Sequence, residues 1–147
     1  MNFFFDKKRF RTFDKLRLIY LLIFLFSFLL TEAGRYIYRP YIYENNINDL
    51  GIADSMGNLG GIVVQIFFGM ILFNPLYKKA IRLVLFFSSG YIVYEFLQPY
   101  LPKGTFDWLD IYGTLLGALF AILILTAVHL PFRKQKEPEQ LIHRDPN

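Results

Sequence analysis

The fold of this chain is decided by one apolar stretch near its C-terminal end, WLDIYGTLLGALFAILILTAVHL (residues 108–130). Pro131 closes the stretch. A helix that spans a membrane needs roughly 17–25 predominantly apolar residues. The sequence therefore predicts a transmembrane helix at about residues 107–130.

Three further apolar blocks precede this stretch, and most charged residues fall in the gaps between blocks. They predict helices at about residues 16–33, 56–77 and 80–98. The chain has 147 residues, of which 54% are hydrophobic and 19% charged, whereas soluble domains carry roughly a quarter charged residues. We expect a single all-α domain, residues 16–130, that forms an integral membrane bundle of four transmembrane helices.

The charges of the loops predict the orientation of the bundle. Basic residues gather in the N-terminal segment 1–15, in the link 74–82 and in the tail 131–147, whereas segments 32–54 and 98–107 are acidic or mixed. Because cytoplasmic loops are enriched in Lys and Arg, both ends are assigned to the cytoplasm. We expect a bacterial cytoplasmic (inner) membrane, with the polar tail disordered.

Two features near the first helix have alternative interpretations. A basic start, an apolar run and Thr31-Glu32-Ala33 resemble a signal peptide, but the long basic region and the poor cleavage site favour an uncleaved helix. The segment after this helix contains Arg35, Arg39 and four tyrosines around Pro40. An interfacial segment lying on the membrane is favoured over a sugar- or lipid-binding platform.

The composition argues against several functional classes. There is no cysteine, which excludes disulfides and thiolate chemistry. The two histidines, His129 and His143, lie at or beyond the end of the last block, so a histidine metal site is not expected. The positive charge flanks the apolar blocks, which argues against nucleic acid as a partner. No cofactor and no metal are expected.

Small and polar residues follow helical spacing on the second and fourth predicted helices. Small residues let membrane helices approach closely. We therefore expect helix packing through these residues: Gly57, Gly61, Gln65, Gly69, Gly113, Thr114, Gly117 and Ala121.

The same topology predicts a carboxylate-rich pocket at the outer leaflet, with these candidate ligand-binding residues: Glu95, Gln98, Asp107, Asp110, Asp54 and Asn58. Structural roles compete for most of them. Helix capping is the favoured role of Asp107, the two roles are balanced for Asp110, and Asp54 and Asn58 suit a loop or a cap. Glu95 lies at the unfavourable end of a helix dipole and needs a partner across the bundle. An intramembrane carboxylate of this kind is a candidate functional residue.

These residues resemble the motifs of VanZ-like membrane proteins. Glu95-x-x-Gln98 matches an E-x-x-Q motif, and Asp110 and Gly117 fall on a D-x-x-x-N-x-x-G motif. Asp54 and, more loosely, Asn58 fall on an earlier D-K-x-x-H motif. Departures from the family pattern lie at four positions: Ser55, Asn58, Gly104 and Thr114. The resemblance covers residues 54–121 and implies a multi-pass membrane protein of a family linked to glycopeptide resistance.

Three functions are compatible with these patterns. The first is binding of a lipid-linked or glycan-bearing cell-envelope ligand at the outer leaflet, without catalysis. The second is a non-catalytic subunit or assembly factor of a larger membrane complex. The third is an intramembrane hydrolase or transferase that uses paired carboxylates as acid and base. No catalytic residue can be assigned, and an enzyme is not the favoured interpretation.

Overall fold

The fold is described by a computed structural model of residues 13–102 and 104–134, with side chains up to Leu130. Most of the predicted cytoplasmic segments 1–15 and 131–147 therefore lies outside the described residues. The helices are, in chain order, α2 (Lys15–Ala33), η1 (Gly34–Tyr38), α3 (Arg39–Glu44), α4 (Ile52–Phe73), α5 (Tyr77–Leu97), η2 (Gln98–Tyr100) and α6 (Trp108–Lys134).

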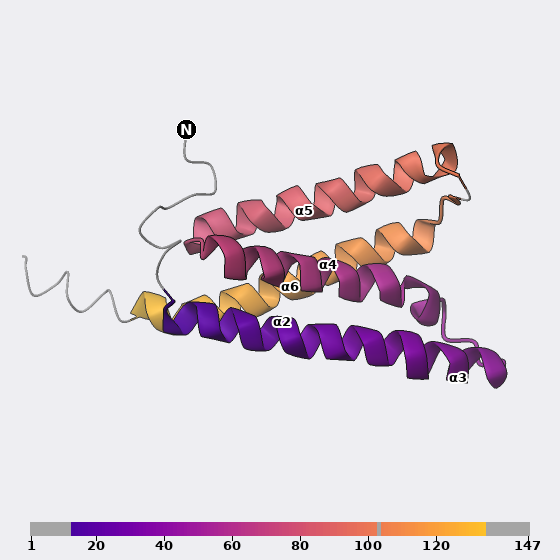
Figure 1. Ribbon diagram of the computed structural model, residues 1–147, viewed down its shortest axis with the longest axis horizontal. Helices are drawn as coiled ribbons and strands as arrows, with labels where there is room; N and C mark the ends of the chain where they lie inside the picture. Colours follow the sequence, from indigo (N-terminus) through magenta and orange to yellow (C-terminus); the bar gives the residue numbers. More distant parts are fainter. Residues whose placement is uncertain (1–12, 103, 135–147) are drawn as a thin grey trace, which may run out of the picture.

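The prediction of an all-α bundle with four membrane-spanning helices is confirmed. Four helical stretches of the described chain are long and apolar enough to cross a membrane: Lys15–Glu44, Ile52–Phe73, Tyr77–Tyr100 and Trp108–Leu130. They lie side by side in one elongated bundle, in which α2 begins and α6 ends at the same end (Figure 1). Which of the two ends faces the cytoplasm stays a prediction.

The first helix is longer than the sequence predicts. The π-helical turn η1 and the short helix α3 continue α2 without a break as far as Glu44. At the end of the bundle opposite to the start of α2, α3 extends beyond the other helices (Figure 1). Pro40 therefore lies inside a continuous helix, directly after the π-helical turn, although a proline in a helix interior removes one hydrogen bond and clashes with the preceding turn. The tyrosine-rich segment is therefore a helical extension of the first span.

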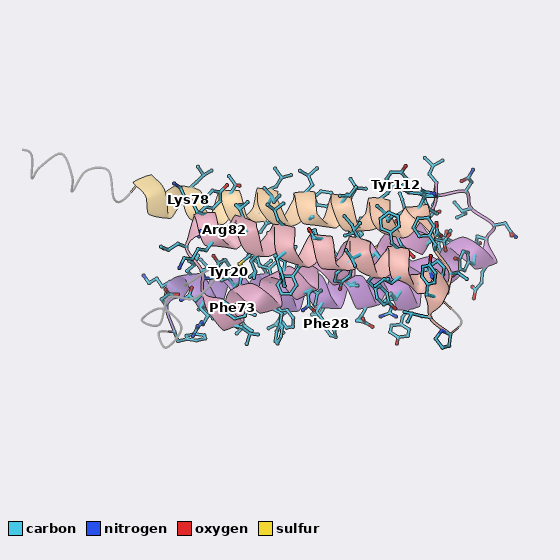
Figure 2. The ribbon with its side chains drawn as sticks, turned by 90° about the horizontal axis from the view of Figure 1, so that it is seen from above. Tyr20, Phe28, Phe73, Lys78, Arg82 and Tyr112 are labelled. Atoms are coloured by element: carbon cyan, nitrogen blue, oxygen red, sulfur yellow. The ribbon has the colours of Figure 1, made fainter. Side chains whose placement is uncertain are left out.

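The surface of the bundle is apolar over its whole length. Phe26 and Leu29 of α2 are 67% and 66% exposed, and Phe28 points away from the other helices (Figure 2). Leu119 and Leu123 give α6 a similar outward face. Contiguous apolar surface on this scale is rare on soluble monomers, and lipid chains are its natural solvent.

Helix α4 forms the centre of the bundle and packs against α2, α5 and α6, most extensively against α6. At the α4–α6 crossing, a Cβ on Gly113 would lie 2.8 Å from the Ser55 carbonyl oxygen, and one on Gly117 would lie 2.4 Å from the Leu59 carbonyl oxygen. Because these two glycines have no side chain, the backbones of α4 and α6 can come into direct contact there. Two further residues that sequence analysis placed on this face of α6, Thr114 and Ala121, are fully buried.

The expected glycine face of α4 is used unevenly. Gly69 packs against Phe87 of α5, because a Cβ there would lie 2.7 Å from that ring. A Cβ on Gly61 would meet only the Tyr91 side chain, whose hydroxyl lies at 3.5 Å, and no atom lies within 4 Å of a Cβ on Gly57. The close approach of α4 to α2 occurs instead at Gly60, where a Cβ would clash with the Thr31 side chain.

Candidate functional site

Glu95 is buried in the last turns of α5, with 1% of its surface exposed. Its two carboxylate oxygens accept separate hydrogen bonds. Asn58 of α4 donates its Nδ2–H to one oxygen at 3.0 Å, and Gln98 donates its Nε2–H to the other. A buried carboxylate is unstable unless such partners compensate it. The partner across the bundle that Glu95 requires is therefore Asn58.

Asp110 lies in the first turn of α6, half-buried, and the charges of Glu95, Asp107 and Asp54 act on it from nearby. Its backbone carbonyl accepts a hydrogen bond from Thr114 at 2.9 Å. Its carboxylate, however, has no hydrogen-bond partner among the described residues. Asp110 is therefore the member of the cluster that remains available to an external group.

Asp107 caps α6. Its Oδ1 accepts a hydrogen bond from the backbone N–H of Leu109 at 2.9 Å, which is the usual geometry of an aspartate N-cap. The segment between α5 and Asp107 is closely packed at Gly104, because a Cβ there would lie 2.0 Å from the Gln98 carbonyl oxygen. Only glycine fits at this position.

Asp54 lies in the first turn of α4 and is paired with the helical extension of the first span. Arg39 donates to its Oδ1 at 3.3 Å, and the Tyr43 hydroxyl donates to the same oxygen. Arg39 also lies over the Tyr43 ring, 5.3 Å from its centroid. The arginine–tyrosine segment thus contacts the predicted polar cluster, a connection that no sequence pattern predicted.

Sequence analysis missed Asp49, which caps α4. Its carboxylate accepts hydrogen bonds from the backbone N–H groups of Gly51 and Ala53, at 3.1 and 2.7 Å, and from the Tyr38 hydroxyl at 3.2 Å. Gly51 adopts a left-handed conformation, with φ of 81°. An Asp shortly ahead of an apolar run is a recognisable helix-start signal, and it would have moved the predicted start of α4 toward its observed start at Ile52.

A second polar cluster, also missed, lies at the opposite end of the bundle. Asn74 is fully buried and donates its Nδ2–H to Asp14 at 3.3 Å, and Arg17 donates to the Leu72 carbonyl at 3.5 Å. Close by, the Tyr20 hydroxyl lies 3.4 Å from His129 Nε2. These contacts join the ends of α2, α4 and α6, so we interpret this second cluster as structural.

The six candidate site residues therefore gather at one end of the bundle, which we call the acidic end. Glu95, Asn58 and Gln98 form a hydrogen-bonded core, Asp107 and Asp54 have partners, and Asp110 offers a carboxylate to an external donor. Hydroxyl and ammonium groups are the natural donors to such a carboxylate. Within the described chain, no three His, Asp or Glu side chains are arranged to hold a metal ion.

Four apolar helices and a polar cluster at one end of their bundle define the class as a multi-pass helical membrane protein. For the particular family, the comparisons give no relative. Neither a protein-family model, nor a curated protein, nor a solved structure matches the chain.

Proposed function

We propose that this chain is a VanZ-like protein of the bacterial inner membrane that binds a lipid-linked or glycan-bearing cell-envelope ligand at its acidic end. The observation that carries the proposal is the Asp110 carboxylate, half-buried and without a hydrogen-bond partner among the described residues. Polar groups at membrane depth are costly, so one that is left unsatisfied indicates a functional contact.

The arrangement of the motif residues supports the resemblance to VanZ-like proteins. Asn58, from the first motif, donates a hydrogen bond to Glu95 at the start of the second, and Gln98 of the same motif donates to the other carboxylate oxygen. Gly117, from the third motif, forms the crossing of α6 with α4. Three motifs that are far apart in the sequence thus meet in one region, with Glu95 as a positioning residue rather than a ligand contact.

The distribution of charge supports an outer location for the acidic end. Lys78 and Arg82 lie at the opposite end, near Tyr20, whereas Tyr112 lies toward the acidic end (Figure 2). Cytoplasmic ends of membrane proteins are enriched in Lys and Arg. The ring of Phe106 packs on Phe96 and Trp108 at 5.6 and 5.1 Å between centroids, as expected of aromatic residues at a membrane interface.

The orientation can be measured directly because the chain has no cysteine. We expect Tyr100→Cys to react in intact cells with a membrane-impermeant maleimide, because Tyr100 is 85% exposed at the acidic end. Lys78→Cys should react only after the cells are opened. Labelling of Lys78→Cys and protection of Tyr100→Cys in intact cells would place the acidic end in the cytoplasm and rule out an outer-leaflet site.

The ligand site can be tested with Asp110→Asn. We expect native mass spectrometry of the wild-type protein, extracted in mild detergent from bacterial membranes, to show a retained envelope lipid. Retention should fall at least tenfold in Asp110→Asn, because losing a charge-assisted hydrogen bond weakens binding by roughly 1.5–3 kcal/mol. Glu44→Gln is the matched control, since it removes an exposed carboxylate from the same end.

Equal retention by wild type and Asp110→Asn would contradict the proposed ligand site. Stoichiometric protein partners in place of lipid, in the same spectra, would favour the alternative of a subunit in a larger membrane complex. The thermal unfolding of each variant is measured alongside, so that loss of the fold is not mistaken for loss of the ligand.

A further inference from the structure

An open groove lies between α4 and α5, on the lipid-facing side of the bundle. It has a volume of about 350 Å³ and is lined by Gln65 of α4 and by one stretch of α5, namely Phe86, Phe87, Ser89, Gly90, Tyr91 and Val93. Its wall is almost entirely apolar. A volume of this size lies within the range of about 300–1,000 Å³ that is typical of small-molecule sites.

The groove borders the close contact of α4 and α5 at Gly69 and Phe87, since Phe87 also lines it. No atom lies within 4 Å of a Cβ on Gly90 or on Gly57, and a Cβ on Gly61 would meet only the Tyr91 side chain. These three glycines therefore do not bring α4 and α5 into close contact. Of the three, Gly90 lines the groove, and its lack of a side chain leaves that part of the wall open to lipid.

The groove leads toward the polar cluster. Tyr91, which lines it, lies four residues before Glu95 on α5, and therefore about one helical turn, roughly 5.4 Å, below it on the same face. Gly90 lies about 10 Å along the axis from the end of α5 at Leu97, which is inside the hydrocarbon region if that end reaches the headgroups. An amphiphile can thus reach the polar cluster and the groove at once.

The negative charge of the acidic end distinguishes between two possible occupants of the groove, a second copy of the chain and a lipid. The acidic end carries the carboxylates of the cluster (Glu95, Asp54, Asp107 and Asp110), and among the described residues that act on Asp110 the only cation is Arg39, which is already paired with Asp54. A second copy docked through a two-fold interface at this face would bring the same acidic surface against itself. A cationic headgroup complements that surface instead.

We infer that the groove between α4 and α5 holds one hydrocarbon chain of a membrane lipid whose ammonium-bearing headgroup lies at the acidic end, beside Asp110. This inference rests on the proposed function and specifies its ligand as an amphiphile with a protonated amine. The almost entirely apolar wall of the groove suits a hydrocarbon chain, and the Asp110 carboxylate holds the headgroup through a charge-assisted hydrogen bond.

The test uses the full chain in vesicles of equal parts phosphatidylethanolamine and phosphatidylglycerol with identical 16:0/18:1 chains. After extraction in mild detergent, native mass spectrometry counts the lipid that stays bound. We expect wild type to retain phosphatidylethanolamine over phosphatidylglycerol. Gly90→Leu, which places a side chain in the groove, should lower this retention at least tenfold. Ala127→Leu places the same leucine side chain at an exposed position of α6, away from the groove, and should leave retention unchanged.

The variants separate the failure of this inference from that of the proposed function. Unchanged retention in Gly90→Leu, together with loss in Asp110→Asn, would overturn the groove and leave the headgroup site standing. Loss in Gly90→Leu with full retention in Asp110→Asn would overturn the headgroup site and with it the proposed function. Equal retention of the two lipids by wild type, no retained lipid, or a dimer that Gly90→Leu converts to a monomer would each overturn the inference.

Discussion

Replacing Gly117 by leucine is expected to destabilise the bundle by at least about 3 kcal/mol, the upper part of the range for overpacked cores. A Cβ at this position would lie 2.4 Å both from the Leu59 carbonyl oxygen and from the Ile62 Cγ2 atom of α4. Because one of these atoms belongs to the backbone, no side-chain rotation relieves the clash. The helices must move apart, and the most extensive helix contact of the fold is lost.

The measurement is unfolding in mixed micelles as the fraction of denaturing detergent is raised. Gly117→Ala should fall between wild type and Gly117→Leu, since it introduces the clashing Cβ alone. Gly90→Ala is the matched control, because that site has no atom within 4 Å and alanine favours a helix over glycine by up to about 1 kcal/mol. Equal midpoints for Gly117→Leu and Gly90→Ala would show that α4 and α6 do not cross at Gly117.

The second large effect is expected at Asn58. Replacing it by alanine removes one of the two donors that hold the buried Glu95 carboxylate, at a cost of about 1.5–3 kcal/mol, as for hydrogen bonds to charged groups. Once Glu95 has been replaced by alanine, the loss of Asn58 should cost much less. The coupling energy from the double-mutant cycle is therefore expected to be about 1–3 kcal/mol.

Thr126 provides the control for this cycle. It bonds the Tyr77 hydroxyl at 3.0 Å near the opposite end of α6, far from Glu95. Asn58→Ala and Thr126→Ala should add to within about 0.5 kcal/mol. If Asn58→Ala and Glu95→Ala were equally additive, the hydrogen bond between α4 and α5 would contribute nothing, and Glu95 would lose its role as the residue that positions the cluster.

Helix boundaries show where reading the sequence succeeded and where it did not. Helix α5 (Tyr77–Leu97) and the start of α6 at Trp108 lie within a few residues of the predicted bounds. Helix α4 begins at Ile52, four residues before the predicted start, because the Asp49 cap draws Asp54 and Ser55 into the first turn. The first helix continues to Glu44, past Pro40, through a π-helical turn that directly precedes the proline, although a proline normally kinks or ends a helix.

The candidate site likewise has features that the sequence predicts and features that it does not. Glu95 needs a partner for a reason that is visible in the sequence, namely a carboxylate at the wrong end of a helix within the membrane. The identity of that partner is not visible, since Asn58 equally suits a helix cap. Likewise, Asp54 offers no sequence signal for its pairing with Arg39 and Tyr43, because these residues meet only through the helical extension of the first span.

The sequence by itself determined four apolar spans, the side on which each polar link lies relative to the others, and the gathering of carboxylates at one end. Each of these follows from hydrophobicity and charge, which are properties of single residues and their order. The tertiary structure alone decided that Gly60, Gly113 and Gly117 bring helices into contact while Gly57 and Gly90 do not. A glycine permits close approach from any side, so only the rotation and tilt of neighbouring helices determine which of them is filled by a helix and which is left open to lipid.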